Sequence, residues 1–394
     1  MKYDFDELVE RRGTGCVKWD ESSSDDMIPL WVADMDFKAA PAIQAAIRKR
    51  AEHGVFGYTH VGEDYYAAVI SWFRRRHGWA IRREEILYTT GVVPAMSVVI
   101  KALTVPGEKV LILSPDYNCF FSSIRNNGCE VLESCLLWLC HHTENRFEID
   151  WEDFETKCAD ERTTVFLLCN PHNPTGRVWT KAELLHMNDI CMKHGVKVVS
   201  DEIHCELVMP GHKFLPFAAV SEQCCQNSVI LNSPSKSFNI AGLQTANIIC
   251  PQAEWRRRID RAININEVCD LNPFGPVALI AAYNESEAWI DELNLYLWDN
   301  YQALCQFAEE KLPEWHVRPL EGTYLAWIDI TATGMTSQAY ADHIMKEAHV
   351  WVNPGTMYGP QSGEGYIRLN IACPRSRLME ALERIEASCH KDNN

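Results

Sequence analysis

The sequence predicts an α/β fold in which helices cover both faces of a largely parallel sheet. Short runs of apolar residues, such as Val110–Leu113, Val165–Leu168 and Val229–Leu231, are typical of strands buried on both faces. Segments with helical apolar spacing separate such runs, for example Lys181–His194 before Val196–Ser200. Strands that alternate with helices form βαβ units, and these units build parallel sheets.

The first half of the chain gives a clear series of helices and strands. Pro41 is suited to the first turn of a helix because its missing N–H has no partner there, and apolar residues then follow on one face as far as His53. Gly91 follows a short strand and precedes an apolar helix. The other predicted elements are helices at Asp6–Arg12 and Glu63–His77, and strands at Ile86–Thr89, Val110–Leu113 and Thr163–Leu168.

The second half changes character after residue 276. The predicted elements before this point are the helix Lys181–His194, the strands Val196–Ser200, Val229–Leu231 and Ala246–Cys250, and the charged helix Glu254–Ile265. A turn-rich break at 272–276 then precedes a long helical region, Val277–Leu312, that we expect to bridge two domains. The remaining pattern is α+β: strands Tyr324–Ile330, His349–Val352 and Tyr366–Ile371, and helices Ser337–Ala348 and Arg375–Ser388.

A chain of 394 residues is long enough for two domains. We expect residues 1–45 to form an N-terminal arm and part of a small domain. Residues 46–276 would form the large domain, and residues 277–394 the small C-terminal domain.

The composition limits the classes of partner. The net charge is −17, from 37 basic and 54 acidic residues, which argues against binding nucleic acid or an anionic membrane through overall charge. No run approaches the roughly 20 apolar residues of a membrane-spanning helix. The first residues show no apolar signal-peptide core, so we expect a cytoplasmic protein.

The sixteen cysteines are expected to be reduced and mostly buried. A cluster from Cys135 to Cys140, followed by His141 and His142, suggests a metal site. Its spacing matches no common zinc pattern, and we therefore predict no metal.

Lys236 carries the strongest chemical signal. It lies in Asn232–Asn239, directly after the strand-like run Ser228–Leu231, at the sheet edge where ligands of α/β proteins bind. A desolvated lysine loses basicity, and a neutral amine attacks carbonyl groups. Ser233 and Ser235 add hydroxyls that can bind phosphate oxygens. The alternative is an ordinary surface lysine in a serine-rich turn.

Other stretches add further candidates. Asn173 lies in Asn170–Gly176, Asp201 ends an apolar strand, and Arg368 lies in Tyr366–Asn370. The amides of Gly91-Val92-Val93 would open a helix and offer an anion site. The segment Trp31–Phe37 could line a substrate pocket or simply be a packed strand and turn.

In this order, Asn-Pro-Thr-Gly, Asp, Lys and Arg resemble the signature of fold-type I enzymes that use pyridoxal 5′-phosphate (PLP). Within that group the chain most resembles the MalY/PatB-type cysteine–sulfur β-lyases. The motifs that carry this resemblance are 29–37, 56–59, 90–94, 200–204, 235–239 and 367–375. The resemblance implies a large domain with a mostly parallel sheet and a smaller α+β C-terminal domain.

The resemblance also implies a role for each motif residue. Lys236 would bind PLP covalently and move the α-proton, while Asp201 would keep the pyridine nitrogen protonated. Tyr117 would stack on the ring. Asn173 and His204 would contact the phenolate oxygen. The phosphate would be bound by Gly91, Val92, Val93, Ser233 and Ser235, and Tyr58 would reach the phosphate of a partner subunit in a homodimer. The amino acid substrate would contact Ala33, Asp34 and Arg368.

Two places depart from common patterns of the group. Many aminotransferases have Gly-Leu-Arg after the lysine, whereas this chain has Gly242-Leu243-Gln244. The loop that often reads Tyr-x-Pro-Phe is Tyr117-Asn118-Cys119-Phe120. Arg368 also has an alternative reading as part of a structural salt bridge.

Three functions compete at this point. A β-lyase would cleave L-cystathionine or a related cysteine S-conjugate to a thiol, pyruvate and ammonia. An aminotransferase would use the same residues, but the segments 31–37 and 91–94 favour the lyase. A ligand-sensing module of a transcription regulator would need an added DNA-binding domain. The motifs begin by residue 29 and the chain is acidic, which leaves little room for such a domain.

Overall fold

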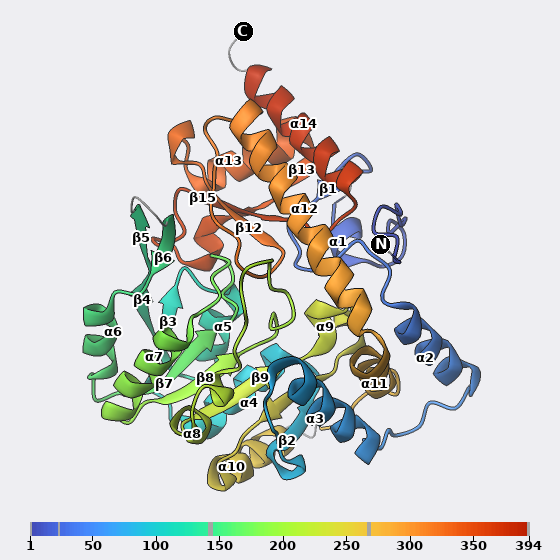
Figure 1. The fold of residues 1–394 in the computed structure, drawn as a ribbon. Helices are drawn as coiled ribbons and strands as arrows, with labels where there is room; N and C mark the ends of the chain where they lie inside the picture. The colour runs from blue at the N-terminus through green and yellow to red at the C-terminus, as the bar shows by residue number, and fades with distance from the viewer. Residues whose placement is uncertain (1, 23, 141–144, 266–268, 392–394) are drawn as a thin grey trace.

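A seven-stranded sheet forms the centre of the computed structural model, which describes residues 2–22, 24–140, 145–265 and 269–391 (Figure 1). In spatial order its strands are β2 (Ile86–Thr89), β10 (Ala246–Ile249), β9 (Ser228–Asn232), β8 (Lys197–Asp201), β7 (Thr163–Cys169), β3 (Lys109–Ser114) and β4 (Glu130–Cys135). β10 pairs antiparallel with both of its neighbours, and the other pairings are parallel. The predicted, largely parallel sheet is confirmed.

Side chains of the central strands alternate between two apolar layers. In β3, Val110 and Ile112 pack with one core cluster, and Leu111 and Leu113 pack with the other. The first cluster contains the helices α4 (Val92–Leu103), α5 (Asn118–Asn126) and α10 (Ala253–Asn264). The second contains α3 (Glu63–His77), α6 (Trp151–Cys158), α7 (Lys181–Lys193) and α11 (Gly275–Glu285). Both faces of the sheet are therefore covered.

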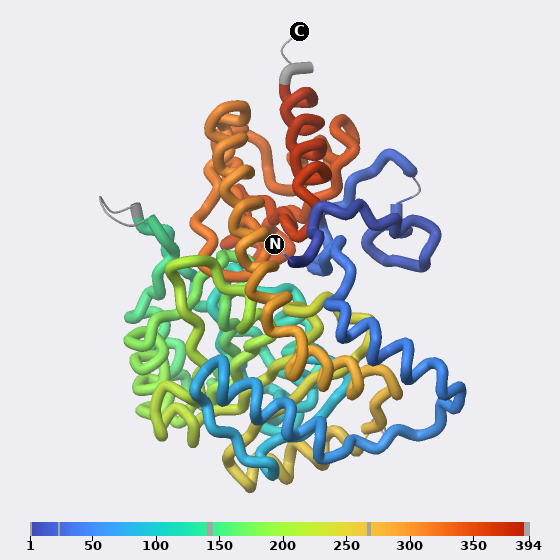
Figure 2. Tube along the Cα trace, turned by 45° about the vertical axis from the view of Figure 1, so that its right-hand side comes forward, coloured from blue at the N-terminus to red at the C-terminus, as the bar shows by residue number. Residues whose placement is uncertain are grey.

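A second sheet lies above the first in Figure 1. It is antiparallel, in the order β11 (His316–Val317), β12 (Leu325–Asp329), β15 (Tyr366–Asn370) and β14 (Asn353–Pro354). The helices α13 (Ser337–His343) and α14 (Arg375–Lys391) accompany it. The long helix α12 (Glu287–Lys311) runs from the lower to the upper part of the molecule (Figures 1 and 2). The domain boundaries at 45/46 and 276/277 stay a prediction.

The N-terminal segment joins the upper part. β1 (Ile28–Pro29) pairs in parallel with β13 (Val350–Trp351). Among the described residues, the remaining α-helices are α1 (Val17–Asp20), α2 (Pro41–Glu52), α8 (Glu222–Gln226) and α9 (Pro234–Ser237), and the remaining strands are β5 (Leu137–Cys140) and β6 (Asn145–Glu148), which form a hairpin. Through β1, the segment that follows at residues 31–37 is held against the C-terminal part of the chain.

Local sequence signals set several helix ends. α3 begins after Gly62 with two acidic residues and ends in basic residues before Gly78, whose φ of 66° is left-handed. Thr180 and Glu183 form a capping box at the start of α7.

Three of the predicted helices differ from the structure. Residues 6–12 are not helical: Asp4 binds the N–H of Asp6, and Glu10 binds the N–H of Arg12, so acidic side chains take backbone donors locally. The region 277–312 is two helices that break at Ser286. α13 ends at His343 and continues as the wider turn Ile344–Ala348. His141 and His142 lie outside the described residues.

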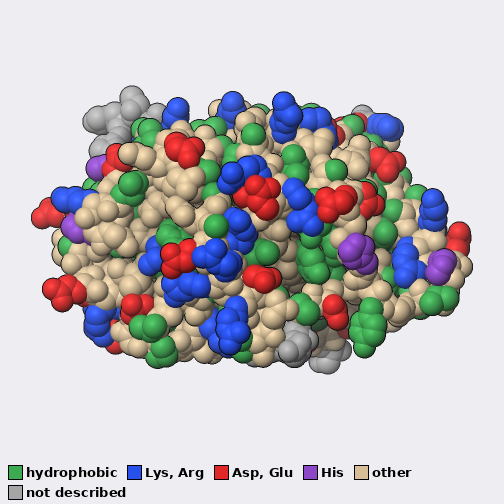
Figure 3. Space-filling model, turned by 90° about the horizontal axis from the view of Figure 1, so that it is seen from below, with side chains coloured by type: hydrophobic (Ala, Val, Ile, Leu, Met, Phe, Trp, Pro, Cys, Tyr) green, Lys and Arg blue, Asp and Glu red, His purple; other side chains and the backbone are tan. Residues whose placement is uncertain are grey.

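The surface carries charges of both signs. Figure 3 shows Lys and Arg side chains interspersed with Asp and Glu over the underside of the molecule. Among the described residues, none of the helices combines the length and apolar character needed to cross a membrane.

Candidate active site

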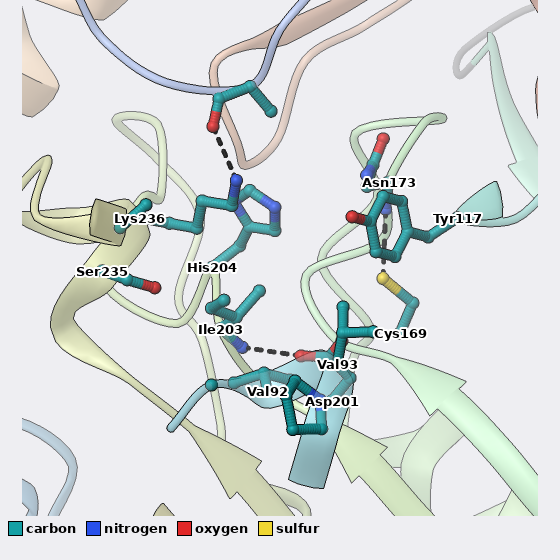
Figure 4. Close-up of a pocket in the computed structure, with 14 residues that line it drawn as sticks. Val92, Val93, Tyr117, Cys169, Asn173, Asp201, Ile203, His204, Ser235 and Lys236 are labelled. Carbon is teal, nitrogen blue, oxygen red and sulfur yellow. Dashed lines mark hydrogen bonds between the residues drawn. The ribbon is translucent and has the colours of Figure 1, made fainter. Parts of the chain in front are cut away.

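A cavity of about 210 Å³ lies at the carboxyl ends of five strands of the large sheet (Figure 4). The loops after β2, β3, β7, β8 and β9 all contribute to it, as expected for a ligand site in this class of sheet. The residues that line it are Ala33, Gly91, Val92, Val93, Pro94, Tyr117, Cys169, Asn173, Asp201, Ile203, His204, Ser235, Lys236 and Ala241.

Lys236 enters the cavity from α9, the short helix that follows β9. Its Nζ donates a 2.6 Å hydrogen bond to the carbonyl oxygen of Ala33. Burial and the charge of Arg368 lower the pKa of Lys236 to about 8, against the opposing effects of Asp34 and Asp201. A large fraction of this amine is therefore neutral near pH 8 and able to act as a nucleophile or base.

Asp201 lies at the end of β8, in the floor of the cavity. Its Oδ1 accepts a 3.1 Å hydrogen bond from the N–H of Ile203. Burial raises the pKa of Asp201 to about 7, and the positive charge of Lys236 opposes this shift only in part. A buried carboxylate of this kind favours a ligand that brings a positive charge.

Tyr117 and His204 present neutral polar groups to the cavity. Tyr117 is the residue directly before α5, and burial raises the pKa of its hydroxyl well above the usual value. Burial, with the charges of Lys236 and Arg368, lowers the pKa of His204 to about 3, so its imidazole is neutral. The Nδ1 atom of His204 is buried and has no hydrogen-bond partner in the described structure. An incoming ligand could supply that partner.

Arg368 lies next to the cavity, on β15 of the small sheet. Its guanidinium donates to Asn173 Oδ1 at 3.2 Å and to the carbonyl of Trp31 at 2.8 Å, and it lies over the ring of Tyr358. The Nε atom is buried without a partner. Among the described residues, Arg368 forms no ion pair with a carboxylate, which argues against a structural salt bridge and leaves its charge for a carboxylate ligand.

Four predicted site residues lie outside the cavity lining: Arg368, described above, and Ser233, Asp34 and Tyr58. The Ser233 hydroxyl donates to the carbonyl of Thr245 at 2.6 Å and accepts from the N–H of Ser235, so it caps α9 instead of facing the cavity. Asp34 is paired with Arg11 at 2.7 Å. Tyr58 is 98% exposed.

Four lining residues were not predicted as ligands: Pro94, Cys169, Ile203 and Ala241. The sequence offered a signal for three of them, Pro94, Cys169 and Ile203. Each lies at or just after the end of a strand, close to a residue that was predicted to belong to the site. Ala241 lies two residues after Asn239, and no motif in the sequence marks it as a lining residue.

The amino-acid sequence matches the aminotransferase class I and II family over residues 25–385. The chain belongs to this family. It is 40% identical to the cystathionine beta-lyase PatB of Bacillus subtilis (strain 168), over 98% of this chain and 99% of PatB. It is 34% identical to the protein MalY of Escherichia coli (strain K12), over 95% and 96% of the two chains.

The solved structures support the same grouping. Cystalysin from Treponema denticola, which contains a pyridoxal 5′-phosphate cofactor, superposes with a TM-score of 0.95 at 34% identity, over the full length of both chains. The fold-type I class expected from the motifs is confirmed.

The cavity residues of this chain fit PLP, the cofactor of the family. Asp201 offers a buried carboxylate to the pyridine nitrogen, and Lys236 offers a partly neutral amine to the aldehyde. The unpartnered His204 Nδ1 can meet a ring substituent. The start of α4, at Gly91-Val92-Val93, provides backbone N–H groups suited to a phosphate.

Proposed function

We propose that this protein is a PLP-dependent carbon–sulfur β-lyase that cleaves L-cystathionine or related cysteine S-conjugates to a thiol, pyruvate and ammonia. The observation that carries the proposal is the 40% identity to cystathionine beta-lyase PatB over nearly the whole of both chains. The likeness to PatB and to the PLP-bound C–S lyase from Staphylococcus hominis favours the lyase over the aminotransferase alternative.

PLP, when bound, withdraws electrons from the substrate's α-carbon and makes its proton acidic. Asp201 would support this effect, because a buried carboxylate next to the pyridine nitrogen would hold a proton on that nitrogen. Its raised pKa reflects burial without a full counter-charge, and a protonated ring would supply that charge.

Two residues would act on the substrate directly. Arg368 would bind the α-carboxylate through the guanidinium that has no carboxylate partner among the described residues. Lys236, with a pKa of about 8, is suited to remove the α-proton and hold it on Nζ.

The sulfur group would then leave from the β-carbon. A thiolate is a good leaving group near neutral pH, since free thiols have pKa values of about 8.5. Tyr117 keeps its phenolic proton at this pH because burial raises its pKa, so the cavity wall next to the substrate stays uncharged.

We also infer that the active protein is a homodimer with shared sites. Tyr58 supports this inference, because a tyrosine that is 98% exposed packs against little of its own subunit. Val55 and Phe56 in the same loop are 63% and 55% exposed, which is typical of a segment covered by a partner.

The proposed activity is tested by incubating the purified protein with L-cystathionine and no keto acid. We expect pyruvate and thiol to appear over many turnovers, and Lys236→Ala to abolish both. If a panel of cysteine S-conjugates yields no thiol, yet amino groups are transferred when a keto acid is added, the aminotransferase alternative is correct.

A further inference from the structure

Four charged side chains join the N-terminal arm to the segment that lines the active site. Arg11 Nη2 lies 2.7 Å from Asp34 Oδ2, and Arg11 Nη1 lies 2.6 Å from Asp36 Oδ1. Lys18 Nζ lies 3.0 Å from Asp36 and 3.5 Å from Asp34. The Lys18 side chain is fully buried and that of Asp36 is 5% exposed. The two positive and two negative charges balance, as a buried cluster requires.

The cluster lies directly next to the backbone carbonyl that binds Lys236, that of Ala33. The carbonyl of Ala33 accepts from Lys236 Nζ at 2.6 Å and from the Tyr324 hydroxyl at 2.8 Å. The next residue is Asp34, and Lys18 Nζ also donates to the Asp34 carbonyl at 3.3 Å. A shift of Asp34 would therefore move the oxygen that orients the Lys236 amine.

A second set of contacts ties the same segment to the lysine's own loop. The Asn239 side chain accepts from the N–H of Met35 at 3.0 Å and donates to the carbonyls of Met35 and Phe37 at 2.9 and 2.8 Å. Asn239 lies three residues after Lys236, so the loop and the segment move together. Arg11 of the arm contacts the same segment through the Asp34 and Asp36 carboxylates and the carbonyl of Met35.

We propose that Arg11 and Lys18 are positioning residues that hold the Ala33 carbonyl against the Lys236 amine, and that Arg11 also shields this amine from the charge of Asp34. The proposal rests on the proposed function, since it concerns the amine that binds PLP. It assigns the N-terminal arm a role in the reactivity of Lys236 as well as in packing.

The direction of the charge effect follows from the groups around Lys236. Burial and then the charge of Arg368 lower its pKa, and Asp34, Asp201 and Cys119 raise it, while the neighbouring His204 is neutral. Without Arg11, the charge of Asp34 is less compensated, so the pKa of Lys236 rises. Asp34→Asn removes that negative charge, so the pKa falls. A purely structural role for Arg11 would not produce opposite shifts.

The test measures the rate at which the full-length chain, freed of PLP, attaches added PLP to Lys236. Borohydride reduction and mass spectrometry of the Lys236 peptide report the rate across a pH series. Arg11→Met is expected to move the midpoint of this profile up by about half a pH unit, and Asp34→Asn to move it down by a similar amount. Arg11→Lys keeps the charge and is expected to restore the wild-type midpoint.

Arg12→Met is the matched control. It removes an equal charge from the same arm, but Arg12 donates to the carbonyls of Trp19 and Met27 and not to residues 34–36. Its midpoint is expected to equal that of the wild type.

Two results would overturn the inference while leaving the proposed function intact: unchanged midpoints in both variants, or shifts in the same direction, with Lys236 still modified. Failure to modify Lys236 in the wild-type chain would instead overturn the proposed function. If Arg11→Met does not fold, the test rests on Asp34→Asn and Arg11→Lys. The shielding effect is contradicted if the midpoint of Asp34→Asn is not lower than that of the wild type.

Discussion

Arg368 donates a 3.2 Å hydrogen bond to the side-chain oxygen of Asn173. This bond joins β15 of the small sheet to the loop after β7 of the large sheet, so the proposed carboxylate site and the proposed cofactor site share one contact. A shift of Arg368 on substrate binding would therefore also shift Asn173, because the two side chains share this hydrogen bond.

Arg368→Lys is expected to lower kcat/KM for a cysteine S-conjugate by about a hundredfold, equivalent to about 3 kcal/mol. A lysine keeps the charge but loses the planar fork that binds a carboxylate through two bonds. Steady-state kinetics measure the change. Arg384→Lys, on the surface of α14, is the control and should stay within twofold of the wild type. An equal loss of kcat/KM in both variants would show that Arg368 does not bind the substrate carboxylate.

Asp201→Asn should stabilise the PLP-free protein while abolishing activity. The folded-state pKa of Asp201, about 7, lies above its unfolded value, so stability is lost as pH rises toward 7 and the carboxylate must ionise in a buried site. The amide avoids this cost. We expect a gain of about 2 kcal/mol at pH 8 in urea unfolding of the PLP-free chain, and a smaller gain at pH 5. A loss of stability at pH 8 would contradict the assigned environment.

His204→Leu should weaken PLP binding by about tenfold, because the substitution removes the buried nitrogen that has no partner within the described structure. His204→Tyr keeps a hydrogen-bonding group and is expected to bind PLP more tightly than the leucine variant. Equilibrium dialysis of the full-length chain compares the two. Equal affinities would show that His204 does not contact the cofactor.

A mixture of Tyr58→Ala and Lys236→Ala subunits should be more active than either variant alone. If Tyr58 serves the partner's site, each mixed dimer contains one site with both native residues. The variants are unfolded together, refolded and assayed against the separately refolded proteins. No gain in activity, with mixed dimers demonstrated by mass spectrometry, would place Tyr58 outside the partner's site.

The sequence was sufficient to locate the cavity because its main residues follow strands directly. Asp201 and Lys236 come after apolar runs, and the carboxyl ends of parallel strands meet at one sheet edge. The alternation of strands and helices likewise predicted the large sheet.

The features that differ from the sequence-based predictions depend on contacts between distant parts of the chain. Nothing local to Asp34 indicates that Arg11 binds it, and the sequence could not show that the Ser233 hydroxyl caps α9. The arm at residues 6–12 has helix-forming residues, but the Tyr296 hydroxyl binds Asp6 and local carboxylates take the backbone donors. Tertiary contacts outweighed local propensity there.

The ratio of thiol to pyruvate formed from L-cystathionine without a keto acid distinguishes a β-lyase from an aminotransferase. A β-lyase releases the two products in equal amounts over many turnovers, and the Lys236→Ala variant releases neither. If neither pyruvate nor thiol appears with a panel of cysteine S-conjugates, and amino groups are transferred to an added keto acid, the protein is an aminotransferase and not a β-lyase.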